Sequence, residues 1–253
     1  MIPVMTQRRA KASTGPCAAG VVLASGAGTR VGASLNKVYL PLAGRRLVSW
    51  SLEAFARVPG VGVLVLVARP EDLDLVESVL DREVTGAVEV VYGGQTRQES
   101  ELRALRHLAE RIDGALIDTV LLHDAARPLI SPALIGGVLH SAREHGGAIP
   151  GLPADDILAV GEDGKSLGER LPGTVIRAQT PQGFRARPLL DAYEQAAREG
   201  FVGTDTASVM ERFSGLPVHW VRGEQQNFKV TYPHDLVVAE RMLASPDYQT
   251  SDS

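Results

Sequence analysis

Short apolar runs alternate with longer amphipathic stretches along most of this chain of 253 residues. The short runs are bounded by turn residues and have the length of buried strands. They cover residues 18–24, 61–68, 88–92 and 119–123, with weaker runs at 148–152 and 218–221. Helical patterns fall between and after them, at residues 47–57, 71–80, 97–112, 189–198, 205–213 and 233–243. A further helix opens at Ser131-Pro132, because serine is a favourable N-cap and proline a favourable first helical residue.

Strands that alternate with helices predict an α/β fold, in which a mostly parallel sheet is covered by helices on both faces. We expect one domain over residues 17–245, since α/β folds of this size are common. Residues 1–16 carry Arg8, Arg9 and Lys11 with no apolar segment after them, so a disordered tail is expected and not a signal peptide. Residues 246–253 are expected to form a second disordered tail. Ligands of such sheets bind at the carboxyl ends of the strands.

Composition narrows the class of protein. A net charge of −4 argues against broad nucleic-acid binding, so any positive field must be local. The single cysteine, Cys17, excludes an intrachain disulfide and a cysteine-based metal cluster. No apolar run has the length of a membrane span, and we therefore expect a cytoplasmic protein that does not bind membranes.

The most informative segment is a glycine-rich turn after the first strand. Residues 23–37 read Leu-Ala-Ser-Gly-Ala-Gly-Thr-Arg-Val-Gly-Ala-Ser-Leu-Asn-Lys. Glycines let the backbone approach a ligand closely, and the N–H groups of such a turn form an anion site. Arg30 and Lys37 would repel each other without an anion between them, which indicates a ligand with several negative charges, such as a nucleoside triphosphate.

Other glycine motifs fit this turn less well. A dinucleotide fingerprint needs a third glycine where Val31 stands, and a Walker A loop needs Lys and Ser or Thr where Ala33 and Ser34 stand. A nucleotidyltransferase loop remains, with an ordinary strand-to-helix turn as the alternative.

Three more polar clusters are candidates for the site, and the first two directly follow predicted strands. Gly93 and Gly94 open the helix at residue 97, so their N–H groups face the same edge of the sheet as the first turn. Asp124 ends another strand, where it could hold Mg²⁺ or orient a substrate hydroxyl, or could merely cap a turn. Lys229 lies between apolar neighbours and either needs an anionic partner or extends along the surface.

In order along the chain, these blocks resemble the 2-C-methyl-D-erythritol 4-phosphate cytidylyltransferases of non-mevalonate isoprenoid synthesis. The first turn alone would match many nucleotidyltransferases, and the later blocks are more specific. The matching segments are residues 23–37, Gly93-Gly94 with Arg97 and Ser100, His123-Asp124-Ala125-Ala126-Arg127-Pro128, Gln179-Thr180-Pro181-Gln182-Gly183-Phe184, Thr204-Asp205-Thr206-Ala207-Ser208, and Asn227-Phe228-Lys229-Val230-Thr231 with Asp235-Leu236.

The resemblance implies a three-layer, Rossmann-like nucleotidyltransferase fold with a projecting arm at about residues 153–177, through which the family forms homodimers. It also implies roles for individual residues. The CTP phosphates would be cradled by Ala24, Ser25, Gly26, Ala27 and Gly28, and the cytosine and ribose would meet Gly94, Gln95 and Ser100. Charge on the α-phosphate would be stabilised by Arg30 and Lys37, while Asp124 and Arg127 would lie at the nucleotide and the substrate hydroxyls. The phosphate of the sugar alcohol would meet Thr180 and Lys229.

The implied chemistry follows from charge. A phosphate monoester attacks the α-phosphorus of CTP, and the protein must screen two anions and align them. The family works with Mg²⁺ bridging the triphosphate, so the ion is bound mainly through CTP, and no side chain is predicted as a metal ligand. No general base is needed, because the attacking phosphate is largely deprotonated near neutral pH.

The arm departs from the family's pattern. The family carries Asp-Thr and then a lysine one residue on, whereas this chain has Asp156 at the threonine position and Leu158 at the lysine position. Pro172 stands where the family has an arginine, and Arg170 could serve after a small shift. Val38 replaces a common glutamine. Since the main changes fall on the acceptor side, two alternatives stay open: a cytidylyltransferase for another polyol phosphate such as ribitol 5-phosphate, and a non-catalytic nucleotide-binding regulator.

Overall fold

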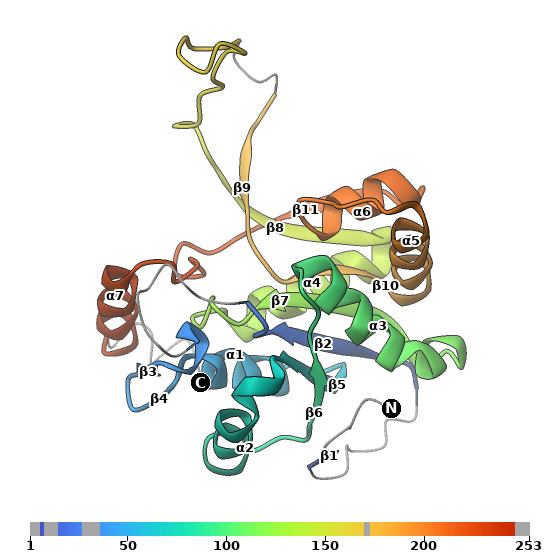
Figure 1. Ribbon diagram of the computed structural model, residues 1–253, viewed down its shortest axis with the longest axis vertical. Helices are drawn as coiled ribbons and strands as arrows, with labels where there is room; N and C mark the ends of the chain where they lie inside the picture. The colour runs from blue at the N-terminus through green and yellow to red at the C-terminus, as the bar shows by residue number, and fades with distance from the viewer. Residues whose placement is uncertain (1–5, 8–14, 27–35, 170–172, 246–253) are drawn as a thin grey trace.

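A central sheet with helices on both faces makes up the body of the molecule (Figure 1). The computed structural model describes residues 6–7, 15–26, 36–169 and 173–245. The sheet has the strand order β1-β6-β5-β2-β7-β10-β8-β11, with β9 paired to β8. Its centre is parallel: β2 (Cys17–Leu23) lies between β5 (Val61–Ala68) and β7 (Ile117–Asp124), and β6 (Val88–Tyr92) flanks β5. The predicted α/β class is confirmed.

The second half of the sheet contains a strand that the sequence pattern did not indicate. β10 (Gln182–Arg185) lies antiparallel between β7 and β8 (Gly147–Pro153), and β11 (Val218–Arg222) closes this edge parallel to β8. β10 has only four residues and follows a proline, so it lacks the length and alternation by which strands are predicted. The start of β10 therefore lies beside the carboxyl end of β7, with Gln182 opposite Leu122.

Two hydrophobic clusters, one on each face of the sheet, give three layers. The first cluster is covered by α1 (Leu47–Ala56), α2 (Leu73–Arg82), α4 (Pro132–His145) and α7 (Pro233–Leu243). The second is covered by α3 (Arg97–Asp113), α5 (Ala186–Glu199) and α6 (Thr206–Phe213). Along β2 the faces alternate, since Ala18 and Val22 pack into the first cluster and Ala19 and Val21 into the second. This is the covering expected of a parallel sheet.

Helix starts agree with their capping residues. Ser131 accepts a hydrogen bond from the Leu134 N–H at the start of α4, as predicted for Ser131-Pro132. Asp205 and Ser208 form a capping box at α6, and Thr96 caps α3 by accepting from the Glu99 N–H. These caps fix the helix ends that face the carboxyl edge of the sheet.

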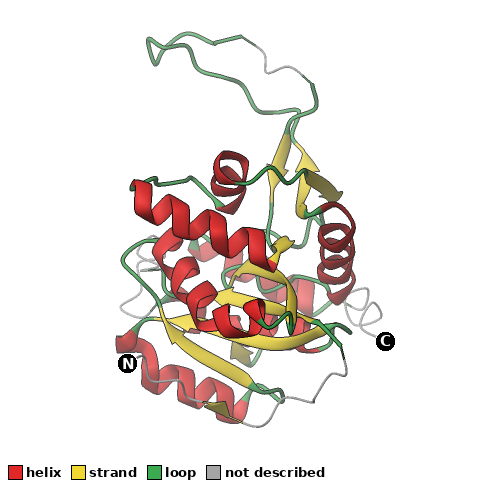
Figure 2. Cartoon of the chain, turned by 90° about the vertical axis from the view of Figure 1, so that its right-hand side faces the viewer, coloured by secondary structure: helices red, strands yellow, loops and turns green. Residues whose placement is uncertain are grey.

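A long excursion leaves the body between β8 and β9 (Ile176–Ala178), as both views show (Figures 1 and 2). β8 and β9 pair antiparallel at its base, from Gly151 opposite Ala178 to Pro153 opposite Ile176. Farther out, an isolated bridge joins Val160 and Leu167. This excursion corresponds to the arm expected at residues 153–177. Several of its apolar side chains are exposed, including Leu158 at 56% and Leu167 at 71%.

Smaller elements complete the described chain. Residues Thr6–Gln7 form β1, which pairs antiparallel with β6, so the prediction that all of residues 1–16 lack structure is wrong at these two residues. The other expected tail, residues 246–253, lies outside the described residues. A short hairpin, β3 (Pro41–Leu42) with β4 (Arg45–Arg46), and two 3-10 turns, η2 (Lys37–Tyr39) and η3 (Pro70–Asp72), connect the larger elements. Within the described ranges, no helix is both long and apolar enough to cross a membrane.

Candidate active site

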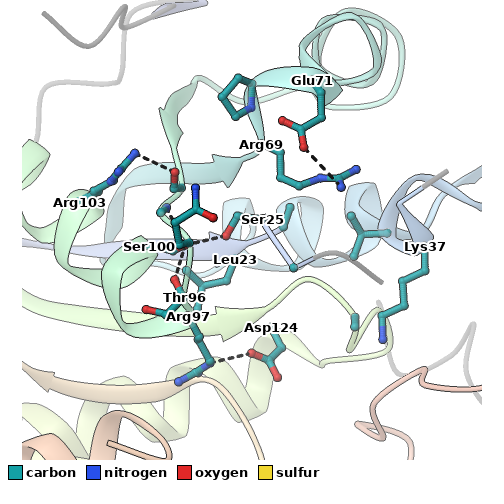
Figure 3. Close-up of a pocket in the computed structure, with 18 of the residues that line it drawn as sticks. Leu23, Ser25, Lys37, Arg69, Glu71, Thr96, Arg97, Ser100, Arg103 and Asp124 are labelled. Atoms are coloured by element: carbon teal, nitrogen blue, oxygen red, sulfur yellow. Dashed lines mark hydrogen bonds and ion pairs between the residues drawn. The ribbon is translucent and has the colours of Figure 1, made fainter. Parts of the chain in front are cut away.

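A cavity of about 720 Å³ opens at the carboxyl edge of the sheet (Figure 3). Its walls come from the turn after β2, the end of β5, the turn between β6 and α3, the end of β7 and the segment before α7. Among the residues that the structure describes, it is lined by five cationic side chains and two carboxylates: Lys37, Arg69, Arg97, Arg103 and Lys229, with Glu71 and Asp124. This excess of positive charge suits a ligand with several negative charges.

One serine hydroxyl joins the two glycine turns. Ser100 Oγ, on the first turn of α3, accepts hydrogen bonds from the Ser25 hydroxyl at 2.9 Å and from the Gly94 N–H at 3.0 Å. It donates to the Thr96 carbonyl at 2.8 Å. Ser100 is 1% exposed, so these contacts are shielded from water. The two turns therefore form a single wall of the cavity (Figure 3).

The second turn needs glycine because side chains of the first turn and of α3 lie against it. A Cβ atom at Gly93 would collide with the side chain of Ser25, and one at Gly94 would collide with that of Glu99. Glu99 also accepts a hydrogen bond from the Gln95 N–H at 2.8 Å, which fixes the tip of the turn. The backbone of Gly94 and Gln95 is thus held at the cavity wall by groups of α3.

Lys37 lies on the opposite side of the cavity from Ser100 (Figure 3). Its side chain is largely buried, and its Nζ donates to the Val230 carbonyl at 2.8 Å, which ties the first turn to the segment before α7. Asn36 beside it donates from Nδ2 to the Ala24 carbonyl at 2.8 Å and to Asp72 at 2.9 Å. Asp72 is clamped in turn by two hydrogen bonds from Arg69. Asn36, held by the Arg69–Asp72 pair, therefore fixes Lys37 beside the carboxyl end of β2.

Asp124 lies between two cations at the end of β7. Its Oδ2 accepts from Lys229 Nζ at 2.7 Å, and its Oδ1 lies 3.4 Å from Arg97 Nε (Figure 3 shows the second contact). Burial by itself would raise the pKa of this carboxyl, but the charges of Lys229 and Arg97 outweigh it and hold the pKa far below its usual range. Asp124 is therefore ionised at neutral pH, and the anionic partner expected for Lys229 is this carboxylate.

A threonine fixes the backbone of Asp124, and a histidine in turn fixes that threonine. The Thr180 hydroxyl accepts from the Asp124 N–H at 3.1 Å and lies 3.0 Å from His123 Nδ1. Burial lowers the pKa of His123 to about 4, so the ring is neutral. Its Nε2 faces the Arg127 carbonyl, which can only accept, so Nε2 carries the hydrogen and Nδ1 accepts from Thr180. Thr180 is 5% exposed and is not among the residues that line the cavity.

Arg127 also lies beside the cavity and not in its wall. Its guanidinium donates to the Asn227 carbonyl at 2.7 Å and to the Ala178 carbonyl at 3.4 Å. Asn227, fully buried, donates to the Thr180 carbonyl at 2.9 Å. Arg127 and Asn227 therefore hold together the three segments that carry Asp124, Thr180 and Lys229.

The remaining expected site residues are distributed as follows. Ala24, Ser25, Gly26, Lys37, Gly94, Gln95, Ser100, Asp124 and Lys229 line the cavity. Ala27, Gly28, Arg30 and Arg170 lie outside the described residues. Asp156 lies on the exposed arm, where it accepts from Arg177 at 3.1 Å, so one chain alone does not bring it to the cavity.

Sequence reasoning gave no role to three arginines of the cavity wall. Arg69 directly follows β5, so the rule that placed Asp124 at the site would also have found it. Arg97 is the first residue of α3 and Arg103 lies in its second turn, and their positions on the cavity side depend on packing that the spacing alone does not give. The described residues contain no group of three or more potential metal ligands.

Comparisons with known proteins agree with this geometry. The family model of 2-C-methyl-D-erythritol 4-phosphate cytidylyltransferase, IspD, matches residues 18–245. A curated protein of that name from Cereibacter sphaeroides is 41% identical over 226 residues, which are 89% of this chain and 96% of the relative.

Solved structures agree as well. A 4-diphosphocytidyl-2C-methyl-D-erythritol synthase from Anaerococcus prevotii superposes with a TM-score of 0.79 at 26% identity, covering 91% of this chain and 97% of that one. A 2-C-methyl-D-erythritol 4-phosphate cytidylyltransferase from Thermus thermophilus gives 0.67 at 30% identity, covering 89% and 98%. The blocks that line or support the cavity all fall inside the matched range, and the chain therefore belongs to the IspD family of 2-C-methyl-D-erythritol 4-phosphate cytidylyltransferases.

Proposed function

We propose that the protein transfers the cytidylyl group of CTP to 2-C-methyl-D-erythritol 4-phosphate, an isoprenoid precursor, and releases pyrophosphate. The observation that carries the proposal is the cavity at the carboxyl edge, where two glycine turns and an excess of cations meet in a chain of this family. The family assignment favours neither ribitol 5-phosphate as acceptor nor a non-catalytic regulator.

The nucleotide would lie against the cavity wall formed by the two glycine turns, which the Ser25–Ser100 hydrogen bond joins. Gly94 and Gln95 present backbone next to the cavity, and Gly26 offers an exposed position at its mouth. A rigid backbone wall suits recognition of a base, because its donors and acceptors keep their directions when the ligand leaves. Ala27 and Gly28 would continue this cradle around the phosphates.

Reaction requires an oxygen of the acceptor phosphate to bond to the α-phosphorus of CTP while the bond to the pyrophosphate oxygen breaks. Negative charge then gathers on the α-phosphate, and Lys37, which lines the cavity, would stabilise it together with Arg30. Mg²⁺ would screen charge on the triphosphate when bound. Since the described residues offer no cluster of ligands, we propose that CTP phosphate oxygens and water hold the ion.

The acceptor would bind on the side of Asp124 and Lys229. Asp124, ionised and fixed by two cations, can accept hydrogen bonds from substrate hydroxyls, and Lys229 can turn toward the acceptor phosphate. Thr180 supports this half by holding the Asp124 backbone. Arg170 and Asp156 belong to the arm, which we propose crosses to a second copy of the chain.

A homodimer through the arm is supported by exposed apolar side chains far from the body. Ile157, Leu158, Val160 and Leu167 are all at least 42% exposed. A partner would bury them and bring arm residues to its own site. A reaction between two highly charged, water-soluble phosphates fits the cytoplasm, where we place it.

An acceptor screen tests the proposal. The purified protein is incubated with CTP and Mg²⁺, and pyrophosphate release is measured with 2-C-methyl-D-erythritol 4-phosphate, with ribitol 5-phosphate and without acceptor. We expect release only with the first. Turnover of ribitol 5-phosphate alone would overturn the acceptor, and CTP binding by calorimetry without turnover of either would overturn catalysis.

A further inference from the structure

A buried carboxylate, Glu101, lies one layer behind the cavity wall on α3. It is 1% exposed and is absent from the cavity lining. The Tyr193 hydroxyl of α5 donates to its Oε2 at 2.7 Å, and the Thr206 hydroxyl of α6 donates to its Oε1 at 3.0 Å. Arg97 Nη1 lies 2.8 Å from the same Oε1. Burial raises the pKa of this carboxyl, and the charge of Arg97 with the two hydroxyl donors opposes that rise by stabilising the ionised form.

Arg97 links this buried group to the site. One edge of its guanidinium pairs with Glu101, while Nε faces Asp124 Oδ1 at 3.4 Å. Asp124 is fixed on its other oxygen by Lys229. A continuous series of contacts therefore runs from Tyr193 and Thr206 through Glu101 and Arg97 to the carboxylate in the cavity.

We propose that Glu101, held by Tyr193 and Thr206, is a positioning residue that keeps Arg97 beside Asp124 and so sets the geometry of the acceptor half of the site. The inference rests on the proposed function in assigning Asp124 to the acceptor. Arg97 pairs with two carboxylates, Glu101 and Asp124. Its charge is therefore divided between them, so Arg97 orients Asp124 without fully neutralising it. Without this anchor, Arg97 would either close on Asp124 or leave it.

The α6 helix supplies a further observation. Thr206 is the first residue of α6, and the capping box of Asp205 and Ser208 fixes that end. Gln182, at the start of β10, donates to Asp205 Oδ2 at 3.2 Å. Residues Thr204–Ser208 do not line the cavity. In this proposal their function is to position the Thr206 hydroxyl so that it donates to Glu101.

Four variants test the proposal in the full-length protein. Glu101→Gln removes the charge at nearly constant shape, and Tyr193→Phe removes one donor. Thr206→Val removes the other donor, while Thr206→Ser retains it. Glu194→Gln is the control, because Glu194 is the neighbour of Tyr193 and pairs with Arg106 across the same α3 and α5 helices at the surface.

We expect Glu101→Gln to raise the KM for the acceptor on the order of tenfold, as for the loss of one hydrogen bond to a charged group. The KM for CTP should stay within about twofold, because the hydrogen bonds that join Ser25, Ser100 and Gly94 do not involve the Glu101 side chain. Tyr193→Phe and Thr206→Val should change in the same direction by a smaller factor, while Thr206→Ser and Glu194→Gln should resemble the wild type.

A crystal structure of Glu101→Gln adds a measurement that needs no turnover: Arg97 should no longer hold its present contact with Asp124. An unchanged Arg97, an unchanged acceptor KM in the folded variants, or equal losses for CTP and acceptor would overturn the proposal. If the wild type turns over no acceptor, the proposed function fails, and the Arg97 position in the variant still decides the inference.

Discussion

Ser100 offers the sharpest test of how the two glycine turns work together. Its hydroxyl makes three hydrogen bonds, to Ser25, Gly94 and Thr96, and Ser100→Ala removes all of them while leaving the Cβ in place. A typical hydrogen bond contributes about 1 kcal/mol to stability, which gives an upper value of about 3 kcal/mol. The Gly94 N–H lies at the cavity, where water can replace its partner, so we expect a loss of about 2 kcal/mol.

For a domain of this size, that loss corresponds to a fall in Tm of about 4–8 °C. The KM for CTP should also rise on the order of tenfold. Without the Ser100 hydroxyl the two turns are less ordered in the free protein, and ordering them on binding costs free energy. Thermal denaturation and pyrophosphate release at varied CTP measure the two effects. The control is Ser51→Ala, a buried serine with one long hydrogen bond, of 3.3 Å, to the Arg127 carbonyl, outside the cavity. A Ser100→Ala protein with wild-type Tm and wild-type KM for CTP would refute the coupling of the turns.

Three further outcomes are expected. Lys37→Ala and the better-packed Lys37→Met should keep the fold and lose on the order of 10²–10³ in kcat, because one α-phosphate cation is removed; full pyrophosphate release would contradict this role. Lys229→Met should leave CTP binding by calorimetry unchanged and weaken acceptor turnover on the order of tenfold, because Asp124 and the acceptor phosphate lose a cation. Arg187→Met, the loss of an exposed cation on α5, is its control and should be neutral. The stability held by neutral His123, whose pKa burial lowers from 6.5 to about 4, is fully present above pH 6.5 and is lost as pH falls to about 4, by at most about 3 kcal/mol. Urea unfolding at stepped pH should show this loss in the wild type and not in His123→Asn, and parallel curves would argue against it.

Much of the fold follows from sequence patterns because its central strands are long and buried. The strands at 61–68 and 88–92 begin and end where predicted, and α3 starts at Arg97 as its cap indicates. β10 could not be predicted in this way, since four residues that begin with glutamine acquire strand geometry only by pairing with β7 and β8. β1 was missed for the same reason, because it consists of two residues paired to a distant strand.

Site residues could be predicted from the sequence where they come directly after a strand. The rule that ligands meet the carboxyl edge predicts that the turn after β2, the turn before α3 and Asp124 lie together, and their described residues line one cavity. Contacts that join distant segments were not predictable. Thr180 faces His123 and the Asp124 backbone, and Glu101 meets Tyr193 and Thr206, only because three helices and β10 pack together.

The arm divides the site residues into two groups along the chain. The residues proposed for the nucleotide, with Arg97 and Asp124, precede the arm in the chain, whereas Thr180 and Lys229 follow it. Thr180 lies between β9 and β10, and Lys229 lies between β11 and α7. Lys229 and Thr180 both contact Asp124, so the two groups are joined at the site, whereas the described arm residues line no part of the cavity and can change without altering its wall. The unusual residues Asp156 and Leu158 lie in the arm itself, between β8 and β9. A graft of residues 153–177 from a relative is thus a compact way to exchange acceptor preference while the CTP wall stays intact.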